Sequence, residues 1–134
     1  MRKPDYNRRV AVTGLGVISP VGNDKETAWS NLIRGVSGIG EITKFDVSRY
    51  EQKAAGEVKG FDATQWMDPK AARRSESSLH FGVAAAKQAV ADSGFVIDDS
   101  NRTDVGVVFG SGAGGQAGRL RLLAGAGVPV QGAV

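Results

Sequence analysis

Few residues of this chain could act together as acids, bases, nucleophiles or metal ligands. His80 is the single histidine among 134 residues, and the sequence contains no cysteine. His80 lies in a stretch with helical spacing and has no second histidine or cysteine to complete a ligand set or a catalytic group. We therefore interpret it as a surface or satisfied half-buried histidine, and we expect no catalytic residue, no metal and no cofactor in this chain.

A glycine-rich loop, Gly110 to Gly115, has the pattern G-x-G-x-x-G and follows an apolar run. A dinucleotide fold would also require an acidic residue about 20 positions further on, to hold a ribose hydroxyl. The chain has no acidic residue after Asp104. Ser111 lacks the G-x-S-x-G elbow of a serine nucleophile, because Phe109 replaces its first glycine. We favour a structural role for these glycines, in sharp turns and close backbone packing, and keep a small nucleotide-binding α/β domain as an alternative.

The net charge of +3 comes partly from two basic clusters. They are Arg2, Lys3, Arg8 and Arg9 near the start, and Lys70, Arg73 and Arg74 midway. Neither cluster is interleaved with the aromatic residues on which nucleic acid bases stack, so we expect no nucleic-acid partner. Charge alone favours a solvated surface for each cluster.

Length and composition are typical of one globular domain, with 41% hydrophobic and 23% charged residues. The apolar runs are far shorter than the roughly 20 residues that cross a bilayer. The basic start and the apolar stretch from Val10 to Ile18 imitate a secretory signal, but Asp5 and several glycines interrupt the pattern. We therefore expect a cytoplasmic protein without a membrane segment and, lacking cysteine, without disulfides.

Two apolar runs predict strands. Val10 to Thr13 is short, β-branched and bounded by glycine, as is typical of a strand buried on both faces, and Val105 to Phe109 has the same character. Between 35 and 62, glycines and mixed charges predict loops, with a short edge strand at Ala54 to Val58.

Helices are predicted between these runs. Asn23, with Glu26 three residues on, predicts a capped helix that Gly35 ends in a left-handed conformation. Asp68 before Pro69 predicts a second start, leading to one helix or two in close succession up to Ser93, where Gly94 follows. Small residues in this segment, Ala84, Ala85 and Ala89, allow a neighbouring element to approach closely. The order strand, helix, helix, strand predicts an α/β layer with a parallel sheet.

Several segments, in order and approximate spacing, resemble the elongating type II β-ketoacyl-[acyl carrier protein] synthases. They are Arg9 to Gly16, Ser19 to Asn23, Trp29 to Ile33 with Gly35, Ser37 to Ile39, Phe45-Asp46, Ala55 to Val58, Ala91 to Gly94, and Val105 to Gly115. The resemblance implies a partial thiolase-like fold, the first part of the N-terminal βα half, over residues 1–115. It also implies an acyltransferase of fatty acid biosynthesis that generally works as a homodimer on acyl carrier protein.

In that family a cysteine at the start of a buried helix accepts the acyl group, and two histidines assist decarboxylative condensation with malonyl carrier. All three positions fall beyond Gly115 in the family pattern, so none can be transferred to this chain. We therefore expect a truncated synthase that is inactive alone. A non-catalytic carrier-docking protein, or a subunit paired with a chain that brings the cysteine, is a second alternative.

One binding feature can be transferred. Lys70, Arg73 and Arg74 align with a basic stretch that meets the acidic surface of the acyl carrier protein in elongating synthases. Glu76 and Ser78 depart from the family, which usually has an aspartate and a large aromatic residue there. The resemblance thus makes these three cations candidate carrier-docking residues, with solvated charge as the alternative.

The composition changes at Gln116, and residues 116–134 are rich in glycine, alanine, valine and leucine. The family pattern does not continue there. Three explanations stay open: a frameshifted end, which we favour, a naturally divergent tail, or a disordered Gly/Ala-rich segment.

Overall fold

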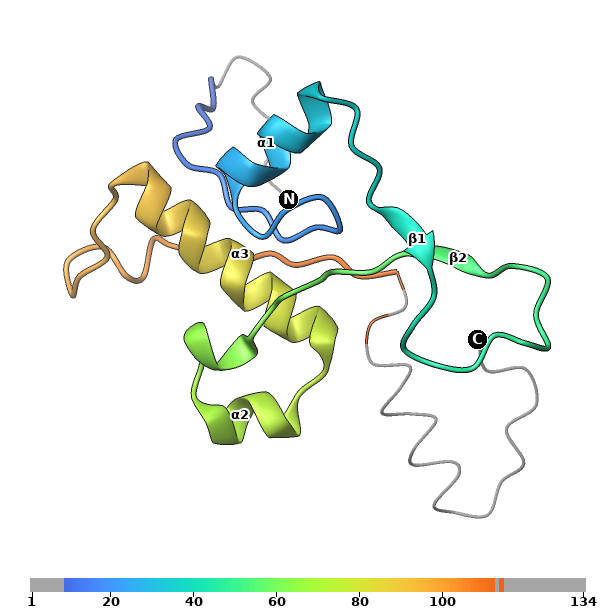
Figure 1. Ribbon diagram of the computed structural model, residues 1–134. Coiled ribbons are helices and arrows are strands. Elements are labelled where there is room, and N and C mark those ends of the chain that lie inside the picture. The colour runs from blue at the N-terminus through green and yellow to red at the C-terminus, as the bar shows by residue number, and fades with distance from the viewer. Residues whose placement is uncertain (1–8, 113, 115–134) are drawn as a thin grey trace, which may run out of the picture.

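The computed structural model describes residues 9–112 and 114, arranged around one long helix (Figure 1). The helices are α1 (Lys25–Ile33), the 3-10 helix η1 (Ala63–Gln65), α2 (Pro69–Arg74) and α3 (Ser77–Ser93), and the strands are β1 (Ile39–Glu41) and β2 (Ala54–Gly56). The short helices η1 and α2 lie at one end of α3, and the small sheet extends away from the helices. None of the described helices has the length and apolar character that a membrane span requires.

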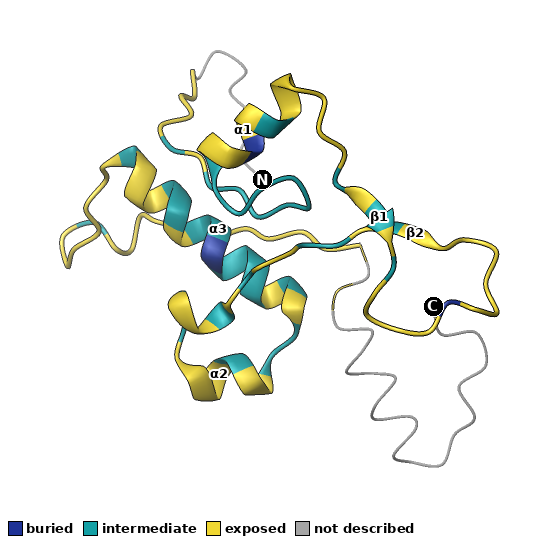
Figure 2. Cartoon of the chain, viewed as in Figure 1, coloured by how far each residue is buried: buried dark blue, intermediate teal, exposed yellow. Residues whose placement is uncertain are grey.

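The centre of the structure is the small-residue face of α3. Ala84 is fully buried there, as Figure 2 shows near the middle of the helix. A side chain at Gly16 would lie 2.8 Å from the carbonyl carbon of Ala85, and one at Gly14 would lie 2.7 Å from the amide nitrogen of Ser93. The chain around residues 14–16 therefore packs directly on the backbone of α3. This confirms the close approach predicted from the alanines.

The predicted start of the first helix is wrong by one residue. Asp24, not Asn23, caps α1, and its Oδ1 accepts a 2.7 Å hydrogen bond from the amide of Thr27. The side chain of Asn23 instead binds a distant segment, because its Nδ2 donates to the carbonyl oxygen of Lys59 at 2.8 Å. The predicted left-handed end at Gly35 is confirmed by a φ of 68°.

The second helical segment divides into α2 and α3. Asp68 caps α2 as predicted and accepts hydrogen bonds from the amides of Lys70 at 2.9 Å and Ala71 at 3.1 Å. Pro69 occupies the first turn, where its missing amide hydrogen is not needed. Gly94 ends α3 with a φ of 65°. The prediction of two helices in close succession is confirmed.

The two predicted parallel strands are not formed. Residues 10–13 and 105–109 carry no strand in the described part of the chain, and Val10 and Val108 are 86% and 100% exposed. A strand needs a hydrogen-bonding neighbour, and neither segment has one among these residues. The sheet that does form pairs β1 with β2 antiparallel, with Gly40 opposite Ala55. The strand predicted at Ala54 is confirmed, whereas β1 was not predicted.

Candidate functional site

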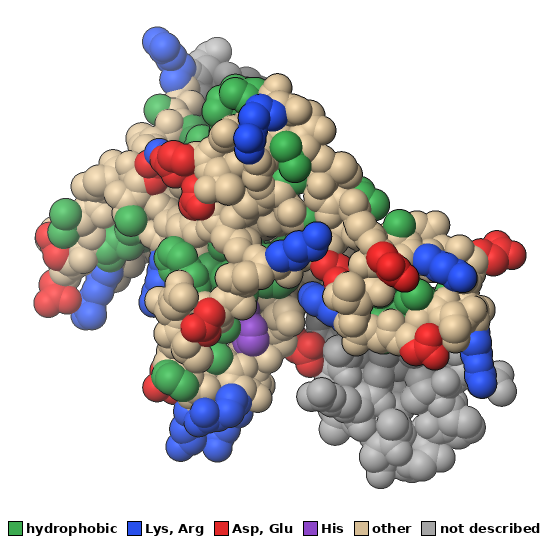
Figure 3. All heavy atoms as spheres, viewed as in Figure 1, with side chains coloured by type: hydrophobic (Ala, Val, Ile, Leu, Met, Phe, Trp, Pro, Cys, Tyr) green, Lys and Arg blue, Asp and Glu red, His purple; other side chains and the backbone are tan. Residues whose placement is uncertain are grey.

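The three predicted docking residues share the exposed face of α2. Lys70, Arg73 and Arg74 are spaced i, i+3 and i+4, which places them on one side of a helix, and all three are exposed. Figure 3 shows a group of lysine and arginine side chains at the lower edge of the view, where α2 lies. Among the ion pairs of the described residues, none involves these cations. The three cations therefore form no direct ion pair with a carboxylate of the described residues.

The opposite side of α2 faces the body of the protein. Ala72 is the half-buried residue of this helix, and its carbonyl oxygen lies 3.0 Å from Nε2 of His80 on α3. The same nitrogen lies 3.0 Å from Oγ of Ser75. These contacts confirm the interpretation of His80 as a satisfied half-buried histidine.

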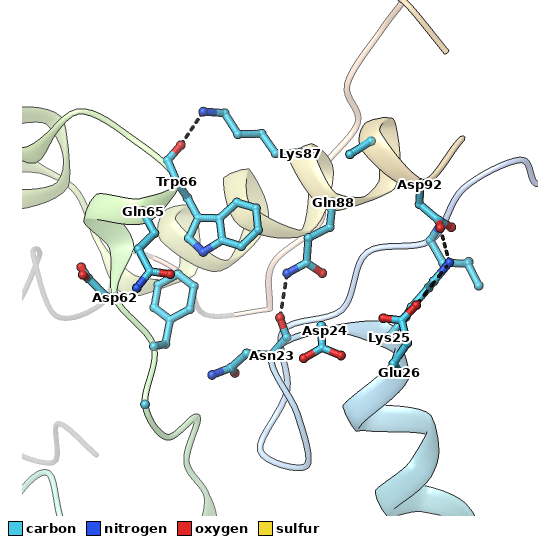
Figure 4. Close-up of a pocket in the computed structure, with 14 residues that line it drawn as sticks. Asn23, Asp24, Lys25, Glu26, Asp62, Gln65, Trp66, Lys87, Gln88 and Asp92 are labelled. Carbon is cyan, nitrogen blue, oxygen red and sulfur yellow. Dashed lines mark hydrogen bonds and ion pairs between the residues drawn. The ribbon is translucent and has the colours of Figure 1, made fainter. Parts of the chain in front are cut away.

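A hollow of about 520 Å³ lies between η1, α3 and the start of α1 (Figure 4). Its polar lining includes Asn23, Asp24, Lys25, Glu26, Asp62, Gln65, Lys87, Gln88 and Asp92. These side chains are largely engaged with the protein itself. Lys87, for example, donates to the backbone carbonyl of Trp66. The hollow and the basic face of α2 are separate features of the surface.

Hydrogen bonds lower the pKa of three aspartates that line this hollow, Asp24, Asp62 and Asp92. Hydrogen bonds from Thr27 lower the pKa of Asp24, and hydrogen bonds from Thr64 lower the pKa of Asp62. The hydrogen bond from Lys25, followed by that from the amide of Leu15, lowers the pKa of Asp92. A general acid needs a raised pKa, so these groups serve as caps and ion-pair partners. The described residues contain no group of three or more side chains suited to a metal ion.

Two side chains of α3 hold the chain segment before α1 in place. Asp92 accepts a 2.9 Å hydrogen bond from the amide of Leu15, and Gln88 Oε1 accepts one of 2.9 Å from the amide of Val17. Asp92 also pairs with Lys25 of α1. Sequence reasoning missed this arrangement. The available signal was the i, i+4 spacing of two polar residues next to the small-residue face.

The ionised carboxylate of Asp92 should stabilise the fold at neutral pH, and this stabilisation should disappear in acid. With a folded-state pKa below the ordinary value, the carboxylate stabilises the fold above the unfolded pKa of about 4. This contribution is lost as the pH falls through the folded pKa. Asp92→Asn should therefore be less stable than the wild type at pH 7, and the difference should shrink towards pH 3.

The measurement is denaturant unfolding of both proteins between pH 7 and pH 3. Asp99→Asn is the control, because the Asp99 side chain is 94% exposed and pairs only with Arg102 at 3.4 Å among the described residues. A constant gap between the wild type and Asp92→Asn down to pH 3 would refute the role of the carboxylate.

Gly114, a described residue of the glycine-rich loop, lies beside the start of α3. Ser111 Oγ accepts a hydrogen bond from the amide of Gly114 at 2.9 Å, and a side chain at Gly114 would lie 3.1 Å from Ser78 Oγ. The strand predicted before the loop is absent. Gly115 and the residues after it, on which the dinucleotide pattern depends, lie outside the described residues.

The sequence matches one protein family over most of its length. A family model described as "Beta-ketoacyl synthase, N-terminal domain" matches residues 7–133. "3-oxoacyl-[acyl-carrier-protein] synthase 2" of Synechocystis sp. is 47% identical over 108 residues, covering 81% of this chain and 26% of that protein. The proteins of the same name from Vibrio cholerae and Staphylococcus aureus (strain N315) are 46% and 42% identical, with the same coverage. The chain thus spans about a quarter of the length of these relatives.

The comparison of structures agrees. A solved structure titled "The ishigamide ketosynthase/chain length factor" matches with a TM-score of 0.69 and 31% identity, over 88% of this chain and 30% of that chain. The described chain is therefore a partial α/β ketosynthase fold of the thiolase-like type. The predicted boundary after residue 115 and the tail at 116–134 lie outside the described residues.

Proposed function

Because this chain belongs to the β-ketoacyl synthase family through its N-terminal domain, we propose that it docks an acyl carrier protein on the basic face of α2. The observation that carries the proposal is the exposed, unpaired set of Lys70, Arg73 and Arg74. Positive charge steers an acidic partner and orients it on the surface. The relatives are named for their action with acyl carrier protein, which supports a carrier as the acidic partner.

The reaction in which this docking takes part is the decarboxylative condensation of fatty acid synthesis. The family's acyl acceptor is a cysteine, and this sequence contains none. The chain alone therefore binds the carrier and forms no acyl thioester. We further propose a cytoplasmic location and, by family, assembly with a second subunit.

A second function is that of a non-catalytic subunit paired with a chain that supplies the cysteine. One observation favours it: the outer face of α1 is apolar and open, with Trp29, Leu32 and Ile33 all more than half exposed. The matched solved structure is titled as a ketosynthase together with a chain length factor. Co-purification with a cysteine-bearing ketosynthase chain would distinguish this function from docking alone.

The docking proposal is tested by titrating an acyl carrier protein with the chain at low and high ionic strength. Exposed charges are screened beyond about 10 Å at 0.1 M salt. Binding should therefore be measurable at low salt and weaken steeply as salt is added. An absence of binding at low salt, or an affinity that salt does not change, would contradict the proposal.

A further inference from the structure

Helix α2 is too short to hold its position through its own hydrogen bonds. It has six residues, whereas isolated helices shorter than about 12–15 residues are marginal in water. None of its residues is fully buried, so burial of apolar surface adds little. Its N-terminus is secured by Asp68. Its position on the protein therefore depends on what holds its C-terminal end.

Two side chains bind carbonyl groups in the last turns of α2, those of Ala71 and Ala72. Ser75 Oγ donates to the carbonyl oxygen of Ala71 at 2.8 Å, which commits its single hydrogen. His80 Nε2 lies 3.0 Å from both the carbonyl oxygen of Ala72 and Ser75 Oγ. The carbonyl oxygen of Ala72 can only accept, so a hydrogen bond to it requires His80 to carry a proton on Nε2 and to donate it. The backbone bond from Ser75 to Ala72 is long by comparison, at 3.4 Å.

This contact links α2 to the most buried element of the structure. His80 belongs to α3, the helix that contains the fully buried Ala84. Ala72, whose carbonyl oxygen accepts the hydrogen bond, is the half-buried residue of α2, and the three cations lie on the exposed side. Anchoring the carbonyl of Ala72 thus fixes the rotation of α2 that turns Lys70, Arg73 and Arg74 towards solvent.

We infer that His80 is a positioning residue for carrier docking, which holds α2 so that its basic face meets the partner as a fixed set of charges. The inference rests on the proposed docking function. Long cationic side chains on a mobile helix would lose more conformational freedom on binding than the same side chains on a fixed one. The histidine acts through the helix and does not itself touch the carrier.

The test compares His80→Leu with His80→Gln in the full chain. Leucine removes the donor, whereas glutamine keeps an N–H at a similar reach. For His80→Leu we expect amide hydrogen exchange over 70–74 to accelerate about fivefold, the effect of losing one hydrogen bond. Its affinity for acyl carrier protein at low salt should fall by a similar factor. Glutamine should restore both.

A matched control separates this role from a general loss of stability. Gln88→Leu removes another hydrogen-bonding side chain of α3, one that contacts Val17 and Asn23 rather than α2. It should leave carrier affinity and exchange over 70–74 unchanged. If His80→Leu does not fold, Ser75→Ala removes the second partner of His80 together with the hydrogen bond from Ser75 to Ala71, and should shift both readouts in the same direction; unchanged readouts would overturn the anchoring of α2.

The outcomes distinguish the inference from the function on which it rests. If the wild type binds the carrier and His80→Leu binds equally well, the inference is overturned and the docking function stands. If the wild type does not bind, the docking function fails. Hydrogen exchange then decides alone: faster exchange over 70–74 in His80→Leu supports the anchoring of α2, and unchanged exchange overturns it.

Discussion

Reversing the charge of α2 is expected to weaken acyl carrier protein binding roughly hundredfold at low ionic strength, because attraction is replaced by like-charge repulsion. The variant combines Lys70→Glu, Arg73→Glu and Arg74→Glu. All three positions are exposed, so the fold should tolerate the change. The measurement is the dissociation constant by calorimetric titration at two salt concentrations. The residual affinity of the variant should respond little to salt or improve as salt rises.

A control with the same change in net charge is available on the loop between β1 and β2. Lys44→Glu, Arg49→Glu and Lys53→Glu also replace three exposed cations, but in a part of the surface remote from α2 in Figure 1. This triple variant should keep an affinity within about threefold of the wild type, because only long-range charge effects are lost. Equal weakening by both triple variants would show that net charge, rather than the α2 face, attracts the carrier.

Gly16→Val is expected to lower the free energy of unfolding by about 3 kcal/mol or more, the upper range for overpacking in a close-packed contact. A Cβ at this position would lie 2.8 Å from the carbonyl carbon of Ala85 and 2.9 Å from the amide nitrogen of Ala89. Both obstacles are backbone atoms within α3, so they cannot move aside as a flexible side chain could. Denaturant unfolding followed by circular dichroism measures the change.

The matched control is Gly106→Ala. Among the described residues, no atom lies within 4 Å of a Cβ at Gly106, and its φ does not require glycine. Alanine there should be neutral or stabilise by about 0.5 kcal/mol, because it restricts the unfolded chain. If Gly16→Val is as stable as Gly106→Ala, the segment before α1 does not pack on α3 as described.

Local signals in the sequence predicted the helices well. Asp68 with Pro69, Gly35 and Gly94 mark helix ends through their own backbone preferences, and the structure confirms all of them. The cap of α1 was misplaced by one residue because Asn23 and Asp24 are both capable caps. Tertiary contacts favour Asp24 as the cap, because Asn23 forms hydrogen bonds with Lys59 and Gln88, which are distant in sequence.

The strands could not be predicted to the same degree. The apolar, β-branched character of 10–13 and 105–109 describes a preference for burial between neighbours, and a strand exists only when another strand supplies hydrogen bonds. The described residues supply none to these segments. The strand β1 was missed because Ile39–Glu41 is too short for alternation to be visible.

The candidate site was predicted in part. The spacing of Lys70, Arg73 and Arg74 places them on one face of any helix, and the structure does so. His80 was correctly expected to have hydrogen-bond partners. Those partners are backbone and hydroxyl oxygens, which a sequence pattern does not predict. The Asp92 and Gln88 contacts were missed for the same reason, because their acceptor roles are directed at amides more than 70 positions away.

We propose that this chain binds the acyl carrier protein without accepting its acyl group. Native mass spectrometry of the chain mixed with acyl-loaded acyl carrier protein at low salt tests both halves in one spectrum. We predict a non-covalent complex that dissociates into a chain of unchanged mass and a carrier that keeps its acyl group. A chain heavier by the mass of the acyl group, or two proteins that never associate, would contradict the account.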